Sequence, residues 1–506
     1  MSNDTLTYSA PTRCPTGVPG LDDVLHGGLP EHRLYLIQGE PGVGKTTLAM
    51  QFLLEGVRRG ETGLYISLSE TREEIEMVAR SHGWNLSALH LFELSDIEEK
   101  LRGETETTFF HPAEVELNRT AETLLAEIER VQPSRVVFDS LAEMRLLAET
   151  PLRYRRQVLR LKQFFAGRKI AVLFLDDRSG SSGELRIESI AHGVISLFRS
   201  SPAYGIARRQ LVVQKIRGSE FREGNHDLVL RRGGMIVFPR LVAADHHAPF
   251  QSGSLACGID GLDALLGGGL DRGTSTMLMG PPGTGKSTLA TKFAHVAAEH
   301  GEKSLLFIFD ETVRTFMARS ASLGMPMEEF VENGLVEVQQ IDPAEISPGE
   351  MVHRIRRAVR EDGVRLVLID SINGYLNAMP EERYLTLQLH ELLAFLAQQG
   401  VITIMVLAQQ GLVGAMQSAV DLTYLADTVM LSRFFEARGS VRLALSIIKK
   451  RSGNHERTIR EYRLGENGIE LGPPLDNMQG VLTGVPILLP DGDLFQSGAK
   501  AEVPKA

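Results

Sequence analysis

Short apolar runs recur along the chain, and their pattern predicts buried β-strands that alternate with helices. Residues 34–37 form the first clear run, a glycine-rich stretch follows, and residues 47–54 then have the apolar spacing of a helix face. The same order returns at 277–279 and 288–294. The longest apolar runs, such as 401–408, are far shorter than the ~18 residues of a membrane span. The pattern therefore predicts an α/β fold, with mainly parallel central sheets flanked by helices, and no membrane segment.

Both glycine-rich stretches fit the phosphate-loop pattern of a glycine, four residues and then Gly-Lys-Ser/Thr. In such loops backbone N–H groups surround a polyphosphate, the lysine reaches the outer phosphates, and the hydroxyl binds Mg²⁺. A nucleoside triphosphate is therefore the expected ligand of each loop. The predicted binding residues are Gly39, Gly42, Val43, Gly44, Lys45, Thr46 and Thr47 in the first loop and Gly280, Gly283, Thr284, Gly285, Lys286, Ser287 and Thr288 in the second.

The two loops belong to a longer internal repeat. Residues 16–29 recur as 257–270, and the same offset of 241 residues separates Lys45 from Lys286. Self-similarity over this length indicates a duplicated domain. We expect the first domain over residues 1–245, the second over 246–475, and a C-terminal segment over 476–506 whose tail is flexible.

Acidic residues that end later strands predict the metal site. Asp139 and Asp370 each end an apolar run downstream of a phosphate loop, which is the order of the Walker B acid. A carboxylate in that place holds Mg²⁺ through its water shell, together with the loop hydroxyl. The predicted metal-binding residues are Thr46 and Asp139 in the first half and Ser287 and Asp370 in the second.

Other polar strand ends have roles that the residues alone leave open. Gln409 follows the run 401–408 and either senses the γ-phosphate or only caps the strand. Lys215 and Arg217 end one strand of the first half, and Lys449 and Arg451 end the matching strand of the second. A Lys-x-Arg pair at a strand end is commonly solvated, but its recurrence in both halves calls for a further explanation.

Composition narrows the class of protein. A chain of 506 residues with 43% hydrophobic and 23% charged residues is expected to fold into two or more globular domains. The formal net charge of −10 disfavours a large nucleic-acid surface. The two cysteines, Cys14 and Cys257, are too few for a metal cluster, and the N-terminus shows no secretory signal, so we expect a cytoplasmic protein.

Together these motifs resemble the tandem RecA-like ATPases of the KaiC family over roughly residues 12–487. The resemblance rests on the repeated segment 16–29, both phosphate loops, the acids that follow the strands, the Lys-x-Arg pairs, and the stretch 458–462. It implies two tandem RecA-like P-loop domains that bind ATP and Mg²⁺. It also implies a homo-oligomer, a two-tiered ring of six subunits with ATP at each subunit interface, and suggests the C-terminal segment as a site for a regulatory protein.

The resemblance assigns chemical roles to residues that spacing leaves undefined. The Lys-x-Arg pairs, Lys215 with Arg217 and Lys449 with Arg451, would reach the phosphates bound by a neighbouring subunit. Arginine supplied in trans suits the charge that develops in phosphoryl transfer. The catalytic residues implied are Glu70, Asp310, Glu311, Lys45, Lys286, Arg217 and Arg451.

Two departures from the family pattern concern the acids and the phosphorylation site. The family has paired glutamates after the second strand, whereas this chain has Ser69-Glu70 and Asp310-Glu311. The adjacent Ser-Thr pair that accepts phosphate in KaiC-like proteins aligns with Thr423 and a tyrosine. Thr423 is therefore either the one candidate phosphoacceptor, with Asp310 or Glu311 as its base, or only a threonine that flanks a strand.

Three functions fit the sequence. The first is an ATP-hydrolysing ring with a signalling or timing role, with serine/threonine autokinase activity as an additional option. The second is a nucleic-acid-dependent ATPase, a motor or recombinase, since the same fold hosts both. The third is a structural ATP-binding scaffold. The acidic charge disfavours the second, and the lysines, acids and arginines present in both halves disfavour the third, so we expect the first.

Overall fold

The computed structural model describes residues 12–93, 112–177, 187–202, 205–377, 382–409, 422–465, 468–483 and 486–488. The chain divides into two compact units, Met1–Arg240 and Leu241–Ala506. The predicted domain boundary at residue 245 lies five residues beyond this division. Each unit has its own sheet and its own hydrophobic core, so each is described by itself.

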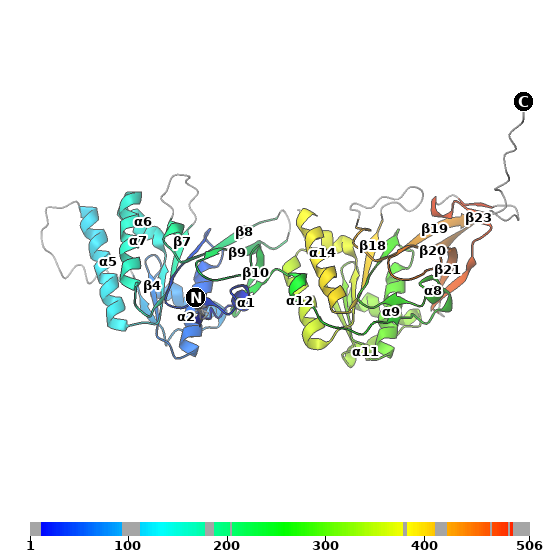
Figure 1. Ribbon diagram of the computed structural model, residues 1–506, viewed down its shortest axis with the longest axis horizontal. Helices are drawn as coiled ribbons and strands as arrows, with labels where there is room; N and C mark the ends of the chain where they lie inside the picture. The colour runs from blue at the N-terminus through cyan, green and yellow to red at the C-terminus, as the bar shows by residue number, and fades with distance from the viewer. Residues whose placement is uncertain are drawn as a thin grey trace, which may run out of the picture. The chain divides into compact units, whose positions relative to one another are not determined.

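The first unit is built on a sheet of nine described strands in the order β11-β10-β9-β8-β3-β7-β6-β4-β5 (Figure 1). The strands from β8 to β5 in this order run parallel, and β9, β10 and β11 extend the sheet by antiparallel pairing. The bounds are β3 (Leu34–Gly39), β4 (Gly63–Ser67), β5 (His90–Phe92), β6 (Arg135–Asp139), β7 (Ala171–Asp177), β8 (Gly193–Ser200), β9 (Arg208–Ile216), β10 (His226–Arg231) and β11 (Gly234–Phe238).

Helices cover both faces of this sheet because alternate strand side chains point to opposite sides. Val137 packs with Phe52 of α2, whereas its neighbour Phe138 packs with Val158 of α7. Both faces are apolar, as expected for parallel strands buried between helix layers. The helices on the first face are α2 (Lys45–Arg58) and α3 (Arg72–His82), and those on the second are α5 (Pro112–Val131), α6 (Leu141–Ala148) and α7 (Pro151–Phe165).

The second unit repeats this plan with the strand order β16-β15-β17-β18-β14-β19-β20-β21-β22. Its strands from β16 to β19 are parallel, and β20, β21 and β22 are added by antiparallel pairing. The bounds are β14 (Ser275–Gly280), β15 (Ser304–Ile308), β16 (Val336–Gln340), β17 (Leu366–Asp370), β18 (Ile402–Ala408), β19 (Thr428–Ala437), β20 (Ser440–Lys450), β21 (Ile459–Gly465) and β22 (Gly468–Pro474).

Two helix layers also enclose the second sheet. Leu368 packs with Phe293 of α9, and the next residue along the strand, Ile369, packs with Leu392 of α14. The predicted α/β fold with mainly parallel central sheets flanked by helices is confirmed. The helices are α8 (Asp260–Leu265), α9 (Lys286–Glu299), α10 (Val313–Ser322), α11 (Glu328–Glu332), α12 (Pro348–Arg357), α13 (Ile372–Asn377) and α14 (Glu382–Gln398).

The repeated segment 16–29 and the C-terminal segment form small additions to the two units. In the first unit β1 (Arg13–Cys14) pairs with β2 (Leu29–Pro30) around α1 (Leu21–Val24), and β12 (Ser254–Leu255) pairs with β13 (Leu270–Asp271) in the second. Beyond residue 476, β23 (Met478–Gln479) pairs with β24 (Ile487–Leu488), and Val481 between them is buried. Residues 489–506 of the predicted C-terminal segment, which include its predicted flexible tail, lie outside the described residues.

Candidate nucleotide sites

Each phosphate loop connects a central strand to the helix that follows it. The first loop leads from β3 into α2, and the second leads from β14 into α9. The residue before each helix is a glycine with positive φ, 112° at Gly44 and 74° at Gly285. A Cβ at Gly285 would lie 2.4 Å from Leu464 Cδ1, so the tight turn requires glycine. The unpaired N–H groups of both helix N-termini are thereby directed at the place of the phosphates.

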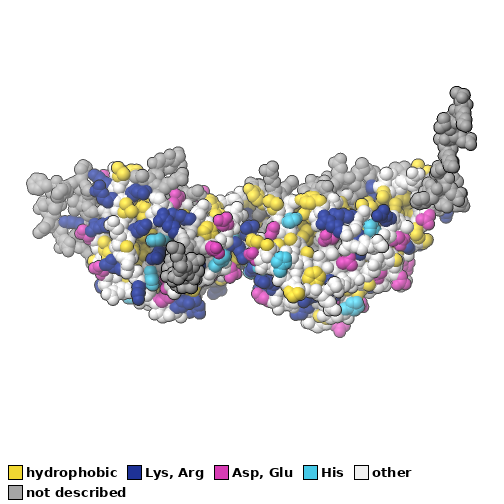
Figure 2. All heavy atoms as spheres, in the orientation of Figure 1, with side chains coloured by type: hydrophobic (Ala, Val, Ile, Leu, Met, Phe, Trp, Pro, Cys, Tyr) yellow, Lys and Arg dark blue, Asp and Glu magenta, His cyan; other side chains and the backbone are white. Residues whose placement is uncertain are grey.

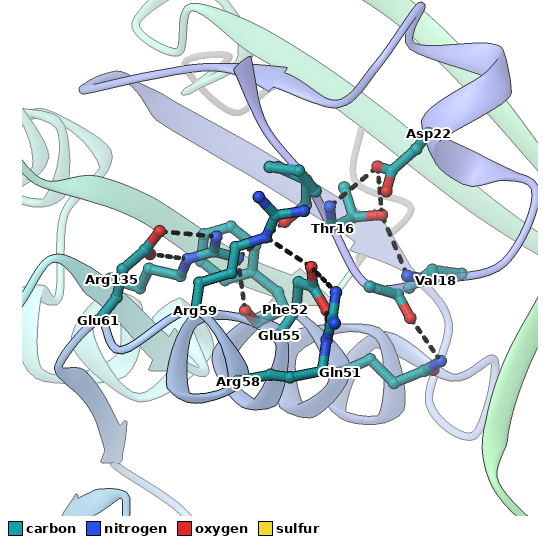
Figure 3. Close-up of polar contacts among 12 residues, drawn as sticks. Thr16, Val18, Asp22, Gln51, Phe52, Glu55, Arg58, Arg59, Glu61 and Arg135 are labelled. Carbon is teal, nitrogen blue, oxygen red and sulfur yellow. Dashed lines mark hydrogen bonds and ion pairs between the residues drawn. The ribbon is translucent and has the colours of Figure 1, made fainter. Parts of the chain in front are cut away.

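A buried arginine, Arg135, is hydrogen-bonded to the backbone of the helix that follows the first loop (Figure 3). Arg135 is fully buried and donates hydrogen bonds to the backbone oxygens of Phe52, at 2.8 Å, and Pro15, at 2.7 Å. Its guanidinium also pairs with Glu61 at 2.5 Å. These contacts join α2, the N-terminal segment and β6, so the loop stands on a fixed support.

The loop lysine and hydroxyl of the first unit meet the acids that end β6 and β7. Lys45 Nζ donates to the backbone oxygen of Gly39 at 2.8 Å and forms an ion pair with Asp177 at 2.7 Å. Thr46 Oγ1 donates to Asp139 Oδ2 at 2.7 Å, and burial raises the pKa of Asp139. This pair of hard oxygen ligands fits Mg²⁺, which when bound would neutralise phosphate charge.

Glu70, the predicted water-orienting residue, follows β4 beside this cluster. Its backbone is held by Ser67, whose Oγ accepts from the Glu70 N–H at 2.9 Å. The carboxylate oxygen Oε2 is buried, and no hydrogen-bond partner lies near it among the residues that the structure describes. Burial raises the pKa of Glu70, and the negative charges of Asp139 and Glu74 raise it further. Among the described residues, the first unit therefore has a buried carboxylate oxygen without a hydrogen-bond partner, in a residue close to Asp139.

The second unit has an open pocket of about 1200 Å³ around its phosphate loop. Lys286 Nζ donates to the backbone oxygen of Pro281 at 2.7 Å, and burial lowers the pKa of Lys286 to about 8. Ser287 is hydrogen-bonded to Asp370, so this hydroxyl and acid also fit a Mg²⁺ site. Other predicted residues that line the pocket are Gly283, Gly285, Thr288, Asp310, Glu311 and Gln409.

The acids that follow β15 are both engaged by side chains of their own unit. Asp310 accepts a hydrogen bond from Ser371 Oγ at 2.7 Å. Glu311 forms an ion pair with Arg319 of α10 at 2.7 Å, and Arg319 lines the same pocket. Neither carboxylate of the second unit therefore matches the unpaired state of Glu70.

The strand next to each phosphate-loop strand ends differently in the two units. Asp177 of β7 lies opposite Gly39, whereas Ala408 of β18 lies opposite Gly280. Gln409 follows, donates its backbone N–H to Gly280, and has a buried side-chain oxygen with no hydrogen-bond partner in the described part of the chain. The structure brings Gln409 to the pocket, and its predicted role in sensing the γ-phosphate stays a prediction.

The first Lys-x-Arg pair lies at the opposite end of the sheet from its own phosphate loop. Lys215 Nζ donates to the backbone oxygen of Glu188, and Arg217 donates to that of Ser189 at 2.9 Å. The Arg217 N–H bonds to His192, whose own N–H bonds to Leu34 at the start of β3. Residue 39 ends β3 five residues later, about 17 Å away at ~3.3 Å per residue.

The second pair has the same arrangement. Lys449 Nζ donates to the backbone oxygen of Thr423 at 2.9 Å, and Arg451 donates to that of Tyr424 at 2.8 Å. Arg451 also forms an ion pair with Asp427 at 3.3 Å. Thr423, the candidate phosphoacceptor, is thus at the sheet end away from the phosphate loop of its own unit.

Comparison with known proteins now identifies the family. The family model described as the KaiC ATPase matches residues 14–242 and again 255–476. The chain belongs to the KaiC ATPase family. The double match confirms the predicted tandem RecA-like domains, and membership implies ATP binding.

Curated relatives align with nearly the whole chain at low identity. The circadian clock oscillator protein KaiC of Parathermosynechococcus lividus is 25% identical over 492 residues, which cover 93% of this chain and 87% of the relative. The circadian clock protein KaiC3 of Synechocystis sp. is 24% identical, covering 93% and 94%. KaiC of Synechococcus elongatus is 24% identical, covering 96% and 93%. These relatives agree with the KaiC resemblance that the sequence motifs predicted.

The motifs assign no role to two residues near the phosphate loops of this KaiC family chain. Asp177 pairs with Lys45, and Arg319 pairs with Glu311. The sequence does contain a sign of Arg319. At the repeat offset of 241 its counterpart in the first half is Val78, so a charged residue replaces an apolar one at this position. Asp177 had a weaker signal, since it follows the apolar run 170–175 as a polar strand end, but its position opposite Gly39 depends on strand register. Among the described helices, none is both long and apolar enough to cross a membrane.

Proposed function

We propose that this chain is a KaiC-like ATPase that binds ATP and Mg²⁺ in both units and assembles through its nucleotides into a ring of six subunits. ATP turnover in the ring would serve a signalling or timing role, in line with the names of its relatives. The proposal keeps the roles predicted for the phosphate loops, for Asp139 and Asp370 as Mg²⁺ acids, and for Glu70 in orienting water.

The proposal of a ring rests on the position of each Lys-x-Arg pair relative to the phosphate loop of its own unit. Each phosphate loop lies at the carboxyl end of its central strand, whereas each Lys-x-Arg pair lies at the amino end, about 17 Å away. A lysine side chain spans only about 6 Å, so Lys215 and Lys449 cannot reach a nucleotide in their own units. A neighbouring subunit that presents its phosphates to this edge would give both pairs a ligand.

Hydrolysis is assigned mainly to the first unit. Its Glu70 has a buried carboxylate oxygen without a partner in the described residues, next to the acid that would hold Mg²⁺. A general base must have a free lone pair directed at the proton it accepts. The acids of the second unit, Asp310 and Glu311, both accept hydrogen bonds from their own unit.

A slow phosphoryl transfer to Thr423 in the second unit is a further part of the proposal. Thr423 lies at the same edge as Lys449, so the neighbour's ATP that this edge would meet is also the donor for Thr423. The adjacent Tyr424 is 55% exposed, but its phenol oxygen lies several ångströms further from the backbone than a threonine hydroxyl. Incubation with γ-labelled ATP should label Thr423, and the label should disappear in Lys286→Ala.

The nucleic-acid ATPase is less well supported. On the face drawn in Figure 2, lysine and arginine side chains are interspersed with acidic ones over both units. A surface that binds nucleic acid needs a continuous basic stripe. ATP turnover that rises clearly on addition of DNA or RNA at physiological salt would favour this alternative.

Native mass spectrometry with and without ATP and Mg²⁺ tests the ring, followed by product analysis of the same sample. We expect hexamers with ATP and smaller species without it, because binding that spans two subunits couples assembly to the nucleotide. Lys45→Ala should weaken assembly more than the exposed control Lys169→Ala. An unchanged monomer at saturating ATP would contradict the ring, and absence of ADP would contradict the ATPase.

A further inference from the structure

The glutamates that follow the second strand of the two units have different neighbours. Glu70 and Glu311 correspond at the repeat offset of 241, and so do Val78 of α3 and Arg319 of α10. Val78 is half-buried and apolar. The helix position that carries the cation Arg319 in the second unit is therefore occupied by an apolar side chain in the first unit.

The ion pair of the second unit engages both oxygens of the carboxylate. Arg319 Nη2 donates to Glu311 Oε1 at 2.7 Å, and Nε donates to Oε2 at 3.4 Å. Both side chains are largely shielded from solvent, with exposed fractions of 24% and 21%. A two-pronged contact of this kind fixes orientation as well as position. Each oxygen keeps a second lone pair, but Glu311 cannot turn its carboxylate toward a water outside this fixed orientation unless the pair opens.

Further contacts hold the arginine in this orientation. Its third guanidinium nitrogen, Nη1, lies 3.4 Å from Thr288 Oγ1 of the phosphate-loop helix, and the guanidinium carbon lies 5.4 Å from the Phe316 ring centroid. The N-cap of α10 is Thr312, whose Oγ1 accepts from the Thr315 N–H at 3.1 Å. The helix that carries Arg319 thus starts directly after Glu311, and its geometry is set by local contacts.

We propose that Arg319 is a positioning residue that holds Glu311 in a closed ion pair, so that the second unit binds ATP but hydrolyses it slowly. This inference rests on the proposed ATPase function and adds a specific cause for the difference between the units. It predicts that the first unit, with Val78 in the matching place, is the faster hydrolase because nothing has to open.

The test measures the second unit in a Glu70→Gln background, where the first unit contributes little turnover. Arg319→Val, which copies the first unit, should raise kcat about tenfold or more and leave KM for ATP unchanged, since a released general base typically contributes 10²–10⁴-fold. Adding Glu311→Gln should abolish the gain. Arg319→Lys keeps a cation but loses the two-pronged contact, so its kcat should lie between those of the parent and Arg319→Val.

The reciprocal exchange tests the same idea in the first unit. Val78→Arg, made in a Glu311→Gln background, should pair with Glu70 and lower kcat about tenfold while ATP binding is retained. For Arg319→Val the matched control is Arg314→Val, because Arg314 is exposed on the same helix, α10, and makes no hydrogen bond or ion pair within the described chain. That control should leave both rates unchanged.

Distinct results would overturn the inference and the proposed function. If Arg319→Val raises KM without raising kcat, the arginine binds nucleotide instead, and the inference is wrong. It is also wrong if the gain persists in the Glu311→Gln double variant, which would indicate general loosening of the fold. If the parent chain and the Lys45→Ala, Lys286→Ala double variant release phosphate equally slowly, the ATPase proposal itself fails.

Discussion

Both units have the same fold and the same kind of phosphate loop. They differ in which residue of the nucleotide site forms an ion pair. In the first unit the loop lysine, Lys45, forms an ion pair with Asp177, while Glu70 Oε2 has no hydrogen-bond partner among the described residues. In the second unit Glu311 forms an ion pair with Arg319, while Lys286 donates to the backbone oxygen of Pro281 and has no ion pair within the described residues. Among the described residues, each unit therefore has an ion pair on the group that lacks one in the other unit.

This contrast shows which positions of the two units can differ while both keep a phosphate site. The loop glycines, the lysine and the acid that ends the fourth parallel strand cannot change without losing the phosphate site. Residues 177 and 319 are not part of that minimum, so one charge at either place alters the site and keeps the fold. We interpret the first unit as tuned toward turnover and the second toward retention of nucleotide.

The largest expected effect is on ATP turnover, and it distinguishes Glu70 of the first unit from Glu311 of the second. Glu70→Gln retains size and hydrogen-bonding capacity but removes the base, so total ATP turnover should fall about 100-fold. Glu311→Gln should change it less than about twofold. Phosphate release in steady state measures both, and a fluorescent ATP analogue checks that binding persists.

Glu76→Gln provides the control, since Glu76 is an exposed residue of α3 that makes no hydrogen bond or ion pair with the described part of the chain. Turnover that survives in Glu70→Gln and disappears in Glu311→Gln would reverse the assignment of the fast unit.

A smaller effect is expected on nucleotide affinity, through the ion pair of the loop lysine. Asp177→Ala copies Ala408 and frees Lys45, so ATP should bind the first unit more tightly. The carboxylate is 40% exposed, and solvent screening limits the gain to about 1 kcal/mol, or about fivefold in Kd. Titration of the ATP analogue in a Lys286→Ala background isolates this unit.

Ala408→Asp in a Lys45→Ala background is the reverse exchange and should weaken binding to the second unit. If Asp177→Ala weakens binding instead, the aspartate helps to hold nucleotide or its cation, and the comparison of the two lysines is wrong.

The sequence predicted those parts of the structure that depend on local order along the chain. The strand expected at 34–37 is β3 (Leu34–Gly39), and the helix expected at 47–54 is α2 (Lys45–Arg58). The convergence of Thr46 with Asp139 also followed from order, because strand, loop, helix and acid occur in a fixed sequence in this fold.

Other features could not be predicted because they depend on pairing between distant segments. Asp177 meets Lys45 only through the parallel register of β3 with β7, which no local pattern encodes. The positions of the Lys-x-Arg pairs likewise required the antiparallel return of β9 and β20.

The smallest expected effect is a shift in the pH dependence of the first unit. Burial raises the pKa of Glu70, and the charges of Asp139 and Glu74 add to it. A general base acts only when ionised, so first-unit turnover should fall on acidification at a pH above the ordinary glutamate value of 4.5. Glu74→Gln removes one negative neighbour, lowers the pKa of Glu70, and should raise turnover about twofold on the acidic limb.

Glutamine also preserves the capping box of α3, in which residue 74 bonds to Thr71, so the helix should remain intact. The kcat profile is measured in a Glu311→Gln background at low ionic strength, because salt screens the interaction of exposed charges. Glu73→Gln, exposed one residue away, should shift the profile less. If the acidic limb is equally steep in the residual turnover of Glu70→Gln, it arises from another group, and the raised pKa of Glu70 does not distinguish the two units in catalysis.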